Sequence, residues 1–257
     1  MKVYLCGPDF ENILCGIYEA FMGSESPDKV RLELREEFQE MELFTEYVEV
    51  NTAQEKVRAV IGFLTRKLSH EVYEKVYAAS LSQEKDRLNQ IVGFLSEAFR
   101  YGSEVVNMLH LPSVYAMFRM QRNVYNEHHQ MTQFVRFART AQGVLVSRIH
   151  PKNDILPLLA LHFADRLPEE NWVIFDKSHG KVAVHQKGAD WFLTDAVEGQ
   201  EIDGGGSCLK ENTDEELYKA LWKTFFDTAA IQERKNHKCQ RNHLPMRFRP
   251  YMTEFNL

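Results

Sequence analysis

Two adjacent histidines follow a glutamate in the segment NEHHQMTQFVRFAR (residues 126–139), and side chains of these types can transfer protons or bind metal ions. The spacing is not the H-E-x-x-H of zinc enzymes, and neighbouring residues of a helix point about 100° apart, so His128 and His129 cannot share one ion. Glu127 and His129 are weak candidates for a catalytic acid and base, because residues i and i+2 do not face each other on a helix. We therefore expect no metal site and no cofactor unless the fold brings another histidine close.

The same segment belongs to residues 113–140, whose pattern predicts one long helix. One face of this helix is apolar and predicts burial, with His128 as a hydrogen-bonded core histidine. Its residues are Met117, Val124, His128, Met131, Val135 and Ala138. The opposite face carries three arginines without an acidic residue. Its residues are Arg119, Arg122, Asn126, His129, Gln133 and Arg136, with Tyr115, Phe118 and Phe137 in the same arc.

Arginines beside aromatic rings are typical of a surface that binds nucleic acid, because guanidinium groups match phosphate oxygens and rings stack on bases. The charge distribution favours this interpretation. The chain has a net charge of −6, yet residues 111–153 hold six Lys and Arg against one acidic residue. The alternative is that these arginines pair with acidic segments of the same protein.

A second basic segment covers residues 231–257, where six Lys and Arg oppose two acidic residues. Amides and aromatic rings alternate with the cations, which predicts a folded segment that can contact base edges as well as phosphates. The candidate nucleic-acid-binding residues here are Arg234, Asn236, Gln240, Arg241, Arg247 and Tyr251.

The elements that must position these residues predict an α+β fold. The helix-rich first half contains two short strands, at residues 2–6 and 45–50, and leads into the long central helix. A β-α-β-β-β unit follows from residue 143, and a C-terminal helix precedes the basic tail. We expect two parts, residues 1–112 and 113–257, or one compact unit.

Three helix starts carry capping signals in the sequence. Thr52 with Glu55, and Thr213 with Glu216, have the spacing of capping boxes, and Asn153 precedes the helix of the β-α-β-β-β unit.

Cellular location follows from what the chain lacks. The four cysteines have no C-x-x-C spacing, which favours reduced structural thiols over a metal site. The N-terminal segment does not have the pattern of a signal peptide, and no apolar run is long enough to span a membrane. We therefore expect a cytoplasmic protein without a membrane partner.

Several segments of the chain resemble a bacterial family named "probable DNA metabolism protein". The resemblance covers YLCGPDFENILCGIYEAF near the start, EHHQMTQFVRF, and IHPKNDILPLLALHFADRL followed by NWVIFD. It also covers residues near the close of the chain, namely Arg234, Asn236, Gln240, Pro245, Arg247, Tyr251, Thr253 and Glu254. Members of that family are encoded beside a radical-SAM protein of DNA modification or repair, and related domains are fused to uracil-DNA-glycosylase-like domains.

Neither of those chemistries is visible in this sequence. The C-x-x-x-C-x-x-C cluster signature of radical-SAM enzymes and a glycosylase-type catalytic loop are absent. The resemblance therefore implies a DNA-binding accessory protein that works with a radical-SAM partner in DNA repair or modification. Two alternatives stay open: a nucleic-acid-processing enzyme that uses His129, and a protein adaptor for the radical-SAM partner that does not bind DNA.

Overall fold

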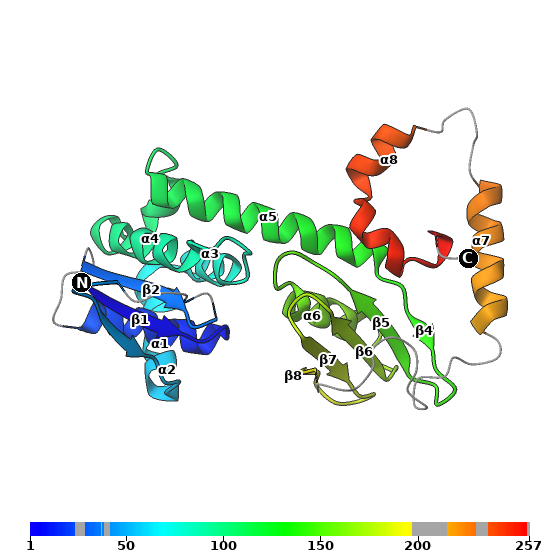
Figure 1. Cartoon of the computed structure of the whole chain (residues 1–257), viewed down its shortest axis with the longest axis horizontal. Helices are drawn as coiled ribbons and strands as arrows, with labels where there is room; N and C mark the ends of the chain where they lie inside the picture. Colours follow the sequence, from blue (N-terminus) through cyan, green and yellow to red (C-terminus); the bar gives the residue numbers. More distant parts are fainter. Residues whose placement is uncertain (24–28, 37, 39–41, 197–214, 230–235, 256–257) are drawn as a thin grey trace. The chain divides into compact units, whose positions relative to one another are not determined.

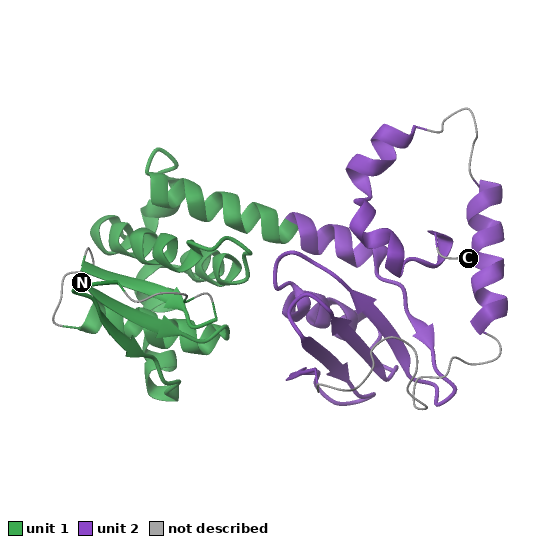
Figure 2. Cartoon of the chain, viewed as in Figure 1, with its two compact units in different colours: residues 1–125 green, residues 126–257 purple. Residues whose placement is uncertain are grey.

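The computed structural model describes residues 1–23, 29–36, 38, 42–196, 215–229 and 236–255. The chain forms two compact units, residues 1–125 and 126–257 (Figure 2). The division falls inside helix α5 (Pro112–Phe134), whereas residue 112, our expected boundary, is where that helix begins.

The first unit is built on a parallel sheet with the strand order β2-β1-β3. The strands are β1 (Lys2–Cys6), β2 (Val30–Leu34) and β3 (Glu46–Glu49). Central β1 is a continuous apolar run after Lys2, as expected for a strand buried on both faces. The two expected strands correspond to β1 and β3, and β2 is a third strand that was not expected. The segment VRLEL of β2 alternates apolar and charged residues at the period of a strand, so the signal was present.

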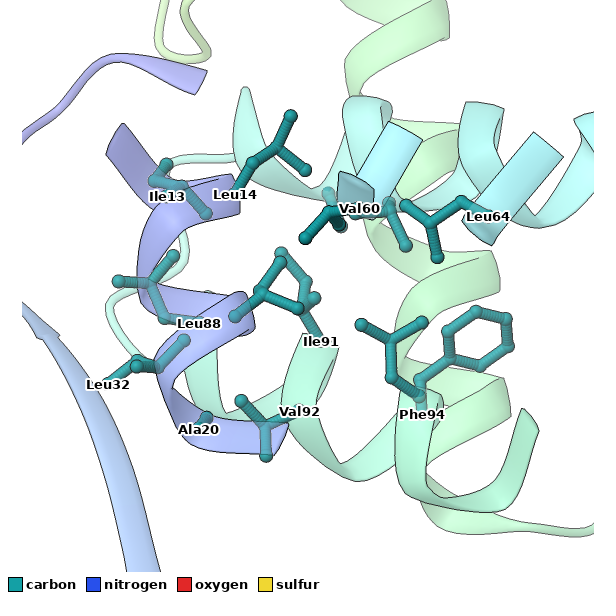
Figure 3. Packing of buried hydrophobic residues seen from close by; sticks show 14 of the residues in the cluster. Ile13, Leu14, Ala20, Leu32, Val60, Leu64, Leu88, Ile91, Val92 and Phe94 are labelled. Atoms are coloured by element: carbon teal, nitrogen blue, oxygen red, sulfur yellow. The ribbon is translucent and has the colours of Figure 1, made fainter. Parts of the chain in front are cut away.

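Helices cover this sheet and enclose the core of the first unit (Figures 1 and 3). They are α1 (Phe10–Met22), α2 (Gln54–Phe63) with a π-helical continuation (Leu64–Leu68), α3 (His70–Ser80), α4 (Arg87–Tyr101) and a 3-10 turn (Gly102–Asn107). Figure 3 shows Ile13 and Leu14 of α1 near Leu88 and Ile91 of α4. All four side chains are buried, so this cluster holds α1 and α4 together.

Helix α5 confirms the predicted long helix but ends earlier than expected. Met117, Val124 and Met131 are buried, as the apolar face predicted, whereas Val135 lies beyond the helix and Ala138 lies in strand β4 (Ala138–Arg139). The Arg136 side chain terminates the helix, because its Nη1 donates to the carbonyl oxygens of Gln133 (2.9 Å) and Val135 (3.2 Å). None of the helices in the described ranges combines the length and apolar composition that crossing a bilayer requires.

The second unit contains a mixed sheet with the strand order β4-β5-β6-β7-β8. Strands β5 (Leu145–Ile149) and β6 (Trp172–Asp176) are parallel and joined by α6 (Leu156–Arg166). Strands β7 (Lys181–His185) and β8 (Phe192–Asp195) continue antiparallel. This order confirms the predicted β-α-β-β-β unit. Its core includes Trp172 and Ile174, which are fully buried.

Beyond the sheet, the second unit ends in short helical segments. They are α7 (Glu215–Ala229), α8 (His237–His243) and two 3-10 turns, Met246–Tyr251 and Thr253–Phe255. The described part of the basic tail is thus folded, as the sequence indicated.

Two predicted helix caps were wrong, because each side chain has a tertiary partner. The cap position of α2 is Ala53, and the Thr52 hydroxyl accepts instead from Asn12 Nδ2 at 2.9 Å. The cap position of α6 is Ile155, and the Asn153 amide donates to Glu127 at 2.6 Å. The capping residue Thr213 lies outside the described residues.

Candidate nucleic-acid interface

Two arginines of the predicted face lie on α5 within the first unit. Arg119 Nη2 is 2.6 Å from Glu84 Oε2, so an acidic residue of the same unit already neutralises its charge. Arg122 is exposed and, within the described part of the chain, forms no ion pair. Tyr115 and Phe118 on the same helix expose their rings. In this unit, Arg122 is therefore the predicted arginine with its guanidinium available.

The polar residues of α5 continue in the second unit. Asn126, His129 and Gln133 are exposed, and the side chains of His129 and Gln133 are 2.9 Å apart between Nε2 atoms. The Gln133 amide donates in this contact if His129 Nε2 is the unprotonated nitrogen. His129 is thus accessible to solvent and oriented by a neighbour one turn along the helix.

His128 lies beside α6 and is half-buried, whereas its place on the apolar face predicted a buried side chain. Its ring meets that of His162 edge-on at 6.5 Å, and its Nε2 is buried with no hydrogen-bond partner among the described residues. Burial lowers the pKa of His128, and the neighbouring His162 lowers it further, although a hydrogen bond with the Leu158 backbone acts in the opposite direction. The neutral imidazole is therefore the form that this site favours.

Arg136 forms an ion pair with the buried carboxylate of Glu254. Its Nη2 lies 2.8 Å from Glu254 Oε1, and the Glu254 side chain is only 3% exposed. Burial raises the pKa of Glu254, but the hydrogen bond and charge of Arg136 outweigh it and leave the pKa lowered. Glu254 Oε2 also accepts from Trp222 Nε1 at 3.2 Å, and the guanidinium lies 5.7 Å from the Trp222 ring centroid. Glu254 thus fixes both Arg136 and Trp222.

Glu127, one of the two catalytic candidates, has a fully occupied carboxylate. Oε1 accepts from the Lys152 backbone (3.0 Å) and from Arg247 Nη2 (2.7 Å). Oε2 accepts from the Asn153 backbone (2.8 Å) and side chain (2.6 Å). The side chain is 5% exposed. These bonds connect α5, the loop before α6 and the tail, so Glu127 organises the unit and has no free lone pair directed at solvent.

Several tail residues of the predicted interface also hold the fold. Asn236 caps α8 by accepting from the Cys239 backbone at 3.0 Å, and Gln240 Oε1 lies 3.4 Å from Arg249 Nη2. Arg241 is exposed, and Tyr251 is half-buried. Arg234 lies outside the described residues. Of the two predicted tail arginines that the structure describes, Arg241 is exposed to solvent and Arg247 is half-buried.

An open groove of about 830 Å³ lies between α7 and the segment that ends α5. It brings together three predicted residues, Gln133, Arg136 and Phe137, with an aromatic face of α7 that the sequence analysis had not assigned to a site. The aromatic residues of that face are Tyr218, Trp222 and Phe225.

The rings of this aromatic face are open to solvent. Tyr218 is 64% and Phe225 63% exposed, and no described residue of α7 is buried. Phe137 also lines the groove, and its ring packs edge-on against Phe163 with 5.0 Å between centroids. The helix ELYKALWKTFFDTA offered a signal, because its large apolar residues recur every three or four positions. The groove has the composition of a ligand site, with mostly apolar walls and a few polar groups.

A group of metal-binding side-chain types lies at the ends of β5 and β6. Ligand atoms of Asp154, Asp176 and His179 are within 4.8 Å of one another. Their bonding is already satisfied in large part. Lys181 Nζ is 2.7 Å from Asp154, and Asp176 accepts from the backbone of Ser178 (2.8 Å) and from His179 Nδ1 (2.7 Å). Asp154 Oδ1 is buried and has no hydrogen-bond partner among the described residues, whereas Oδ2 pairs with the lysine. The bonds of Asp176 hold the turn between β6 and β7.

Two of the four cysteines, Cys6 and Cys15, have the structural character that their spacing indicated. Cys6 and Cys15 are buried and unpaired, and burial, followed by the nearby Cys15, raises the pKa of Cys6 to about 12. Such a thiol is unreactive at neutral pH. Cys239 is exposed, and Cys208 lies outside the described residues.

Fold and groove together define an α+β protein with an aromatic groove whose wall is fixed by a buried arginine–glutamate pair. The family described as "Domain of unknown function (DUF4130)" matches residues 85–254. The chain belongs to this family. No curated protein and no solved structure matches the chain.

Proposed function

We propose that the chain is a nucleic-acid-binding accessory protein of bacterial DNA repair or modification. The observation that carries this proposal is the groove, which Tyr218, Trp222, Phe225 and Phe137 line together with Arg136. Flat aromatic rings stack on every type of base. A groove that binds an aliphatic ligand does not need so many aromatic rings.

The polar groups of the groove suit the same ligand. The Gln133 amide can bond a base edge, and the Arg136 guanidinium adds a planar cation beside Trp222. Exposed cations elsewhere, Arg241 in the second unit and Arg122 in the first, can contact phosphates.

Titration of the full chain against fluorescein-labelled oligonucleotides tests the proposal by fluorescence anisotropy. Tyr218→Ala and Phe225→Ala should each weaken binding by about 1–3 kcal/mol, the value of one stacked base. Phe192→Ala is the matched control, because this aromatic residue of β8 is 54% exposed and does not line the groove. Absence of binding to single strands and duplexes alike would overturn the proposal.

A protein adaptor for the radical-SAM partner is a second candidate, favoured by the exposed apolar residues of α7. Leu217, for example, is 60% exposed. This function predicts a stable complex with the radical-SAM protein in analytical ultracentrifugation and no affinity for oligonucleotides. Because the Glu127 carboxylate is occupied, the enzyme alternative depends on His129. It predicts that His129→Ala abolishes turnover without weakening binding.

A further inference from the structure

We infer that the groove selects unpaired bases, so that the chain binds single-stranded nucleic acid in preference to duplex and gains affinity mainly from stacking. This inference rests on the proposed function and adds to it the class of nucleic acid and the source of the binding energy.

The first argument is access to the faces of the bases. In a duplex, each base is covered on both faces by its neighbours and presents only its edges in the grooves. Tyr218 and Phe225 present exposed rings to the groove, and Phe137 lines it as well. A base can reach the faces of these rings only if it is unpaired, or after the helix has been opened at a cost. Single strands and loops offer such bases directly.

The second argument is charge. In the second unit, Arg136 is paired with Glu254 and Arg247 with Glu127. Arg139 Nη2 is likewise 3.0 Å from Glu170 Oε1. Duplex DNA carries one charge per ~1.7 Å of its axis, and proteins bind it by releasing many counterions with free cations. These three arginines are already neutralised by carboxylates and release few counterions, which leaves exposed cations such as Arg241 for phosphate contacts.

The groove itself carries a carboxylate, which adds to this argument. Glu215 lines the groove, and its Oε2 accepts from the Arg139 backbone at 3.0 Å. Lys219 lines the groove as well, so Glu215 reduces the positive charge that the groove offers to the dense phosphates of a duplex. A flexible single strand can place its phosphates away from this carboxylate. Because aromatic rings stack on every type of base, we expect the affinity to depend little on the base sequence of the strand.

The test compares three labelled probes of equal length with the full chain: an oligo-dT strand, the same length of duplex, and a strand of abasic sites that keeps the phosphates but lacks bases. We expect oligo-dT to bind at least about tenfold more tightly than the duplex or the abasic strand, because the loss of a single stacked base has an effect of this size. The logarithm of affinity should fall by no more than about 1.4 per decade of salt, the effect of roughly two phosphates on a single strand.

The possible outcomes separate this inference from the proposed function. If the duplex or the abasic strand binds as tightly as oligo-dT, or if the salt slope is steep, the inference is wrong and nucleic-acid binding stands. If no probe binds, both are wrong. Tyr218→Ala and Phe225→Ala should reduce the preference for oligo-dT over the abasic strand, and Phe192→Ala should not. Melting curves of the three variants establish that each is folded.

Discussion

The carboxylate of Glu254 meets the guanidinium of Arg136 at 2.8 Å, although 118 residues separate them in the chain. Glu254 is nearly excluded from solvent and accepts the Trp222 indole N–H as well. One carboxylate thus positions both a cation and an aromatic ring of the groove. The predicted binding residue Arg136 is part of the wall of the site, and its charge is balanced from within the protein.

Glu254→Gln should lower the free energy of unfolding by about 2 kcal/mol, because a charged hydrogen-bond acceptor is lost next to a partly buried guanidinium. Urea denaturation followed by circular dichroism measures the effect. Glu216→Gln removes the same charge from an exposed position of α7 and should change stability by less than about 0.5 kcal/mol. Equal effects of the two substitutions would contradict a structural role for the pair.

Arg247→Ala should destabilise the protein by about 3 kcal/mol, because it leaves the buried Glu127 carboxylate without its cation. Arg241→Ala removes an exposed arginine from the same tail and serves as the control. In a double-mutant cycle, Glu127→Gln and Arg247→Ala should be strongly non-additive. Additive effects would show that the two side chains do not interact in solution.

His179 should stabilise the fold more at acidic than at alkaline pH. Burial lowers the pKa of His179, but the hydrogen bond and charge of Asp176 exceed that effect and leave the pKa raised above its usual value of 6.5. Because the pKa of His179 is higher in the folded than in the unfolded protein, its protonation stabilises the fold. This stabilisation is complete at a pH below the pKa of the unfolded state and is lost as the pH rises through the pKa of the folded state. The stability difference between wild type and His179→Gln should therefore be larger near pH ~5.5 than near pH ~8.5. A difference independent of pH would contradict the ion pair.

His128 should act in the opposite direction. Its pKa is lowered, chiefly by burial, so the unfolded chain binds the proton first as the pH falls. The stabilisation from neutral His128 is complete above the unfolded pKa and is lost as the pH falls below it. His128→Met should make the protein less sensitive to a change from pH ~7.5 to ~5.5, measured as the shift in melting temperature. If the shift in melting temperature is the same in His128→Met and wild type, other groups cause the loss of stability at acidic pH.

The sequence predicted those parts of the fold that depend on local periodicity. The β-α-β-β-β unit and α5 were recognisable because apolar spacing and turn residues are properties of neighbouring positions. Caps were less predictable, because Thr52 and Asn153 can cap a helix or bond elsewhere, and their tertiary partners Asn12 and Glu127 decided between the two.

The candidate site was predicted only in part, for a related reason. The spacing of α5 identified a polar face, and Gln133, Arg136 and Phe137 of that face do line the groove. The pattern could not show which carboxylates pair with the arginines, because Glu254 is 118 residues from Arg136. Nor could the pattern place α7 at the same groove, because periodicity identifies the apolar face of a helix but not the residues that this face contacts.

The bond between Glu127 and Arg247 has a consequence for the order of events during synthesis. The two residues are 120 positions apart, so at ~5–20 residues per second the ribosome adds Arg247 roughly ten seconds after Glu127. Throughout this interval the carboxylate lacks its cation, and the loop and tail that it joins cannot be closed. The buried hydrophobic cluster of the first unit lies within residues 4–120, all of which are synthesised before Glu127. The second unit, by contrast, cannot form its Glu127–Arg247 ion pair until almost the whole chain has been made.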